Sequence, residues 1–183
     1  AATTVLTNED LVRAGVRSLP EALRLVPGIN VAQVDASRWA ISARGFNGLF
    51  ADRILILIDG RSVYSPLYGG VFWIDQDLMI EDVRQIEVVR GPGGALWGAN
   101  ASNGIINVIT KNSKETKGTI LSVGVGSETK LSTAARYGAA LSEDTSWRAY
   151  TKYQSNDDSS HPNFPNAKDA WQQTTSGLRL DSQ

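Results

Sequence analysis

The sequence predicts an α+β fold, a small mixed sheet with short helices, followed by a segment of antiparallel β strands only. Two observations predict it. Residues 1–112 mix helical and strand signals, whereas residues 113–183 contain strands that alternate apolar and polar side chains. The continuous apolar run at 54–58 (ILILI) is typical of a strand buried on both faces. We therefore predict two domains, 1–112 and 113–183.

Two short helices are expected near the amino terminus. Residues 7–10 (TNED) have capping-box spacing, and Gly15 is suited to end the helix that they begin. Ser18 begins a second helix with Pro20 in its first turn, and the Pro-Gly pair at 27–28 ends it.

The strands of the first domain are separated by turn residues. Asp59-Gly60 is a tight-hairpin dipeptide, and the chain is expected to return through 63–64. Asp77 is expected to cap a short helix that runs through Val83. The predicted strands are 29–34, 39–44, 53–59, 85–90 and 104–110.

The second domain alternates with a period of two in four runs, at 119–126, 130–141, 146–154 and 173–182. Each run is about the ten residues of a tilted membrane-barrel strand with one apolar and one polar face. Because a soluble antiparallel sheet alternates in the same way, the alternation by itself leaves both interpretations open.

Composition excludes several classes of function. The 18 basic and 19 acidic residues give a net charge of −1, so no nucleic-acid partner is expected. There is no cysteine, which removes disulfides and thiolate metal sites. His161, the sole histidine, lies in a polar loop, and we assign no metal site, no catalytic residue and no cofactor. The glycine-rich stretch 91–98 has the wrong spacing for a phosphate-binding loop.

Five motifs in order carry a resemblance to a known family. Together they cover essentially all of residues 5–112 and resemble the plug domain of TonB-dependent outer-membrane receptors. The motifs are 23–28 (LRLVPG), 41–46 (ISARGF), 57–60 (LIDG), 86–92 (IEVVRGP) and 95–101 with 104–111 (ALWGANA and GIINVITK).

The resemblance implies a fold and a role. A plug of this family is an α+β domain lodged in a 22-stranded outer-membrane barrel, of which residues 113–183 would be the first, incomplete part. Such receptors are not enzymes. They take up a scarce external chelate, powered through the TonB protein. We expect a ferric siderophore, with cobalamin or haem as alternatives within the family. A soluble periplasmic α+β binding module is the alternative from another class.

The resemblance also implies that the chain is a fragment. The TonB-binding segment lies upstream of the plug in this family, and residues 4–7 already resemble the first plug strand, so that contact is expected to be absent. Most of the barrel wall is expected beyond Gln183. A sheet of four strands exposes two edges, so self-association through these edges is expected.

The resemblance further implies a plug–barrel lock made by Arg44, Glu87 and Arg90. In the family, arginines at the two arginine positions pair with wall glutamates, and a guanidinium suits this task because it stays charged and forms forked bonds. We expect both arginines to be exposed or bonded locally. Glu87, three residues before Arg90, is expected on the same strand face.

The resemblance also implies that two glycine-containing loops, 46–52 and 64–73, lie near the apices that face outwards and contact ligand. Their aromatic faces and amide donors suit a bulky, partly apolar chelate. Phe72 and Trp73 are as readily explained by packing in the core. The ligand-contact candidates are Asn47, Phe50, Tyr64 and Tyr68, and the glycines assigned to structural turns are Gly45, Gly60, Gly91 and Gly98.

Overall fold

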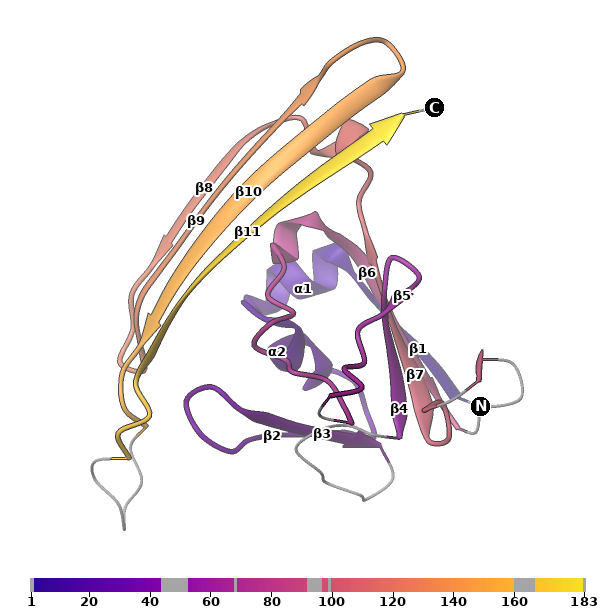
Figure 1. Cartoon of the computed structure of the whole chain (residues 1–183), viewed down its shortest axis with the longest axis vertical. Helices are drawn as coiled ribbons and strands as arrows, with labels where there is room; N and C mark the ends of the chain where they lie inside the picture. The colour runs from indigo at the N-terminus through magenta and orange to yellow at the C-terminus, as the bar shows by residue number, and fades with distance from the viewer. Residues whose placement is uncertain are drawn as a thin grey trace. The chain divides into compact units, whose positions relative to one another are not determined.

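The computed structural model describes residues 2–43, 53–67, 69–91, 97–98, 100–159 and 167–182. The chain divides into two compact units (Figure 1). The first comprises Ala1–Val34 and Arg38–Thr110, and the second comprises Asp35–Ser37 and Lys111–Gln183.

The first unit is built on a mixed sheet, as predicted, and this sheet has five strands. Its strand order is β1-β6-β7-β4-β5. The β4–β7 pair is parallel and the other pairs are antiparallel. The strands are β1 (Ala2–Thr7), β4 (Ile54–Ile58), β5 (Arg61–Ser62), β6 (Val83–Arg90) and β7 (Gly104–Thr110). A separate antiparallel hairpin is formed by β2 (Ile29–Gln33) and β3 (Trp39–Ala43).

Two short helices pack on one side of this sheet, α1 (Asn8–Ala14) and α2 (Leu19–Leu23) (Figure 1). Thr7 and Asp10 form the predicted capping box of α1, and Gly15 ends the helix in the left-handed conformation. Ser18 caps α2 through its side chain. The helices bury Leu11 and Leu23 in a core shared with the inner faces of β6 and β7.

The helix predicted from Asp77 to Val83 is wrong in its extent. The structure has a single 3₁₀ turn, η1 (Ile80–Asp82), which no side chain caps at its own amino-terminal end. The turn is instead held by a residue of α1. The side-chain amide of Asn8 donates to the carbonyl oxygens of Ile80, Glu81 and Val83 at 3.2, 3.3 and 2.7 Å. A tertiary contact therefore replaces the predicted local cap.

The Asp59-Gly60 pair forms the predicted tight turn between β4 and β5. Both residues have positive φ, 48° and 77°, as a type I′ turn requires. The returning strand is shorter and earlier than predicted, because Arg61 and Ser62 already pair with β4. The Asp59 carboxylate accepts two hydrogen bonds from Thr110, from the amide at 2.8 Å and from the hydroxyl at 2.6 Å.

The second unit is a four-stranded antiparallel sheet with the order β11-β10-β9-β8. A 3₁₀ turn, η2 (Ser113–Thr116), precedes it. Figure 1 shows that the strands are long and curve together. The strands are β8 (Gly118–Gly124), β9 (Thr129–Ala140), β10 (Thr145–Asn156) and β11 (Trp171–Ser182).

The two faces of this sheet have the reverse of the usual polarity. The apolar face is open, with Leu121, Val123 and Leu178 about three-quarters exposed (76, 75 and 75%). The opposite face buries charged side chains, including Arg136 at 6% and Arg148 at 5%. A soluble sheet buries its apolar face, so this arrangement favours the membrane-barrel interpretation. No helix in the described ranges is long and apolar enough to cross a membrane.

Candidate functional site

The predicted lock residues Glu87 and Arg90 lie on opposite faces of β6, which corrects the expectation that they share a face. Side chains alternate along a strand, so residues three apart point to opposite sides. Arg90 lies with Ile86 and Val88 on the helix-covered face. Glu87 lies on the other face, where its cross-strand neighbour is Asn107.

Both carboxylate oxygens of Glu87 accept hydrogen bonds within the first unit. The side-chain amide of Gln85 donates to Oε1 at 2.5 Å, and the side-chain amide of Asn107 donates to Oε2 at 3.1 Å. Beside this polar group, Leu55, Leu57 and Ile105 form a second small apolar cluster. Glu87 is thus part of a hydrogen-bonded cluster on the second face of the sheet.

Arg90 packs its side chain against the backbone of Gly28. A Cβ atom at Gly28 would lie 2.6 Å from the Arg90 guanidinium, so a side chain at position 28 would displace the guanidinium from this position. The Nε atom of Arg90 is buried and has no hydrogen-bond partner among the described residues. A buried guanidinium nitrogen of this kind is costly unless a partner supplies an acceptor. Arg44 lies outside the described residues.

Among the ligand-contact candidates, only Tyr64 lies in a described range. It is half-buried at the base of a loop that is closed by backbone hydrogen bonds between Ser65 and Gly70. Trp73 packs in the main core with 5% exposure. Asn47, Phe50 and Tyr68 are outside the described residues, as is Gly45; Gly60, Gly91 and Gly98 have φ values of 77°, 135° and 81°.

In the second unit, a carboxylate closes the neck of the long loop between β10 and β11. Asp169 accepts hydrogen bonds from the amide and the hydroxyl of Ser159 at 2.8 and 2.6 Å. It also accepts one from the Ala36 amide at 2.9 Å. In the other direction, Asp158 accepts from the Ala170 amide at 2.9 Å. The two ends of the loop are therefore fastened reciprocally.

These hydrogen bonds lower the pKa of Asp169 to about 2, with the Ser159 hydroxyl as the largest cause, followed by the Ser159 and Ala36 amides. Because the pKa is lowered, the ionised carboxylate stabilises the neck fully at pH values above 3.8, the ordinary pKa of an aspartate. This stabilisation is lost as the pH falls towards 2. In a carboxyl-carbon NMR titration we expect Asp169 to titrate near 2. Ser159→Ala should move the midpoint towards 3.8, and an unchanged midpoint would contradict the assigned cause.

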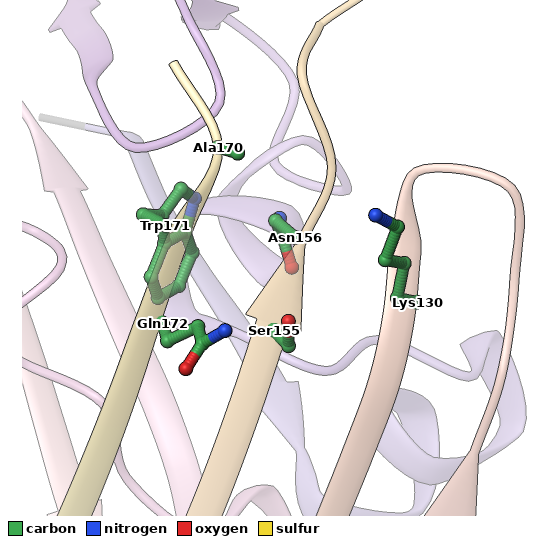
Figure 2. Close-up of a pocket in the computed structure, with 6 residues that line it drawn as sticks. All are labelled: Lys130, Ser155, Asn156, Ala170, Trp171 and Gln172. Atoms are coloured by element: carbon green, nitrogen blue, oxygen red, sulfur yellow. The ribbon is translucent and has the colours of Figure 1, made fainter. Parts of the chain in front are cut away.

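An open pocket of about 380 Å³ lies beside this neck. Figure 2 shows side chains from the adjoining ends of three strands, with Asn156 between Trp171 and Lys130. Lys130 also pairs with Asp157 at 2.9 Å. The pocket is lined by Lys130, Ser155, Asn156, Ala170, Trp171 and Gln172.

Sequence reasoning missed a cluster at the other end of the sheet, around the residues that connect the two units along the chain. Residues 111–117, which we call the junction segment, lie against the polar face of β9, β10 and β11. Ser113 hydrogen-bonds to the hydroxyl of Ser146 and to the carboxylate of Asp181. One signal was present in the sequence: Asn112 and Glu115 have capping-box spacing, and they form that box.

The fold and these sites together define a class of protein. A small α+β domain precedes strands that expose an apolar face and bury a charged one, and this combination is that of an outer-membrane receptor with a globular domain and a barrel wall. The family model of the TonB-dependent receptor plug domain matches residues 1–105. The chain belongs to this family, whose members are outer-membrane receptors and transporters rather than enzymes.

Relatives by sequence include vitamin B12 transporters. BtuB of Vibrio vulnificus is 36% identical over 130 residues, which cover 70% of this chain and 20% of the relative. BtuB of Vibrio cholerae is 30% identical over 139 residues, 76% of this chain and 22% of the relative. The chain thus spans about a fifth of the length of these relatives.

Similar solved structures include siderophore receptors. PirA of Pseudomonas aeruginosa has a TM-score of 0.66 and 25% identity, over 99% of this chain and 32% of that chain. The ferric yersiniabactin uptake receptor FyuA of Yersinia pestis has a TM-score of 0.72, over 98% of this chain and 28% of that chain. At 21% identity, FyuA supports the fold alone.

Proposed function

We propose that the chain is the gate and the first wall strands of an active transporter that takes up a scarce external chelate with energy delivered through TonB. The observation that carries the proposal is the reversed polarity of the four-stranded sheet, with Leu121 and Leu178 open and Arg136 and Arg148 buried. An apolar outer face suits lipid, whereas the soluble binding module would have to leave that face in water.

The loop lengths give the wall strands a direction. In outer-membrane barrels the short turns face the periplasm and the longer loops face outwards. The turn between β9 and β10 is short, and the connection between β10 and β11 is long. The pocket beside Trp171 therefore belongs to the outer end of the wall, and the junction segment belongs to the periplasmic end.

Ferric siderophores are the first ligand class that we propose, because the siderophore receptor PirA, at 25% identity, matches 99% of this chain in structure. Cobalamin is the second, because the sequence relatives with 36 and 30% identity are vitamin B12 transporters. Both ligands are bulky metal chelates, which suits loops that carry aromatic faces and amide donors.

Uptake assays distinguish these ligands. Cells that lack their own receptors would express the receptor from its complete gene and be offered radiolabelled ferric siderophores and cobalamin, with and without TonB. We expect TonB-dependent accumulation of one class. Accumulation that persists without TonB, or no accumulation of any chelate, would contradict the proposal.

For the lock, we propose that Arg90 pairs with a carboxylate of the barrel wall, since its buried Nε has no partner among the described residues. Arg90→Ala should loosen the plug and admit a bulky antibiotic that the outer membrane normally excludes, raising sensitivity several-fold. Arg84→Ala is the matched control, because Arg84 is an exposed arginine on the same strand. Equal sensitivity of the two variants would remove Arg90 from the lock.

A further inference from the structure

We infer that the junction segment is a fixed anchor, which stays bound to the wall strands while the plug rearranges to let ligand pass. The inference rests on the proposed function, and it concerns where the moving part of the gate ends. Chain motion that begins in the plug would stop at Thr110, and residues 111–117 would remain part of the wall throughout transport.

The first observation is that the junction segment is held at both ends by polar contacts, which are part-buried at its beginning and buried at its end. At its beginning, the Arg148 guanidinium donates to the carbonyl oxygen of Lys111 at 2.6 Å. The Ser113 amide donates to Asp181 at 2.8 Å. At its end, Arg136 donates to the carbonyl oxygen of Thr116. Backbone groups that a 3₁₀ turn leaves unpaired are thus satisfied by the sheet.

These contacts are enclosed, which makes them costly to open. Ser113 and Ser146 are 0 and 1% exposed, and their hydroxyl oxygens lie 2.7 Å apart. Arg136 and Arg148 are almost fully buried beneath the segment. Lifting the segment would break the hydrogen bonds that these two buried guanidinium groups donate to its carbonyl oxygens. The loss of hydrogen bonds from buried charged groups is destabilising.

Strand register explains why the side chains that contact the junction segment lie close together. Arg148 stands opposite Gly138 on β9 and opposite Arg179 on β11, so the three form one row across the polar face. In the next row, Ser146 stands opposite Asp181. Arg179 in turn orients the Asp181 carboxylate through hydrogen bonds of 2.8 and 3.0 Å. Three strands therefore contribute to one site.

Gly138 provides the space in which the segment lies. A Cβ atom at this position would come within 2.3 Å of the Thr116 carbonyl oxygen and 3.1 Å of its carbonyl carbon. These are backbone atoms, so the segment itself would have to shift. Gly138 carries no positive φ that would require glycine for backbone reasons. Its lack of a side chain serves the close approach of the junction segment.

The test is a cross-link that makes the anchor permanent. The 183 residues contain no cysteine, so Ser113→Cys with Ser146→Cys places one defined pair in this part of the receptor. The two side chains already meet at 2.7 Å, which suits an S–S bond of about 2 Å. We expect the oxidised receptor to transport its chelate at the rate of the reduced form and of the two single variants.

Loss of uptake on oxidation, with recovery on reduction, would overturn the inference, because it would show that the segment must leave the wall. An unmodified receptor that takes up no chelate would instead show that the proposed function is wrong. The two failures are therefore distinguishable in the same assay.

A second measurement examines the anchor without relying on transport. In Gly138→Ala we expect the Ser113 amide to exchange with solvent about tenfold faster or more, because the displaced segment loses its contacts with the sheet. Gly126→Ala is the matched control, since a Cβ there meets only the Thr129 carbonyl oxygen at an ordinary 3.5 Å. Equal exchange in both variants would overturn the anchor, because it would show that the segment is not held against β9.

Discussion

Replacement of Ile106 by alanine is expected to destabilise the first unit by about 3 kcal/mol. Ile106 is 1% exposed, and β7 lies between β6 and β4 in the sheet. Its side chain belongs to the core that the helices cover. Truncation removes buried apolar contacts and leaves a cavity that the neighbouring strands cannot fill without moving. A loss of this size is a large fraction of the stability of an ordinary domain.

The measurement is native-state hydrogen exchange at the amides of β6 and β7, which reports on this sheet alone. Val5→Ala is the matched control, because Val5 lies in the same sheet on the edge strand β1 and is 47% exposed. It should change stability by no more than about 0.5 kcal/mol. Similar losses for the two variants would show that the core does not depend on β7 as described.

Replacement of Asp59 by alanine is expected to destabilise the first unit by about 2 kcal/mol. The measurement is again native-state hydrogen exchange at the amides of β6 and β7. The carboxylate accepts hydrogen bonds from both the amide and the hydroxyl of Thr110, which is 8% exposed, so its removal breaks two hydrogen bonds at a largely buried residue. Alanine is also disfavoured at a φ of 48°. The end of β7 should therefore loosen at the residue before the junction segment.

Asp59→Asn separates the two causes. Asparagine tolerates the left-handed conformation and keeps an oxygen acceptor for Thr110, so we expect it to cost less than about 1 kcal/mol. If asparagine were as destabilising as alanine, the carboxylate charge would be essential. If both variants kept full stability, the contact between Asp59 and Thr110 would not hold the end of β7.

Predictions from sequence succeeded where the physical cause is local. The Thr7 capping box, the Ser18 cap and the Asp59-Gly60 turn depend on residues within a few positions of one another, and the structure has all three. The failed prediction at Asp77 has a non-local cause. The turn that follows it is held by Asn8, far away in the sequence, and no local pattern reveals such a contact.

The sites show the same division. The alternating pattern of the runs 130–141, 146–154 and 173–182 puts Arg136, Arg148 and Asp181 on one polar face, because side-chain direction in a strand depends on position alone. It could not show that the junction segment lies on that face, since this depends on how three strands are aligned. For Glu87 and Arg90 the prediction of a shared face was wrong for a local reason, because residues three apart on a strand lie on opposite faces.

Local signals in the amino-acid sequence were therefore sufficient for the α+β class, the positions of most strands and the family resemblance that the plug-domain match supports. The tertiary structure decided which polar groups meet: Asp59 with Thr110, Glu87 with Asn107, and Ser113 with Ser146 and Asp181. The reason is physical. Helix caps and turns depend on interactions between residues that are close in the sequence. The contacts named above depend on strand register, which long-range packing fixes.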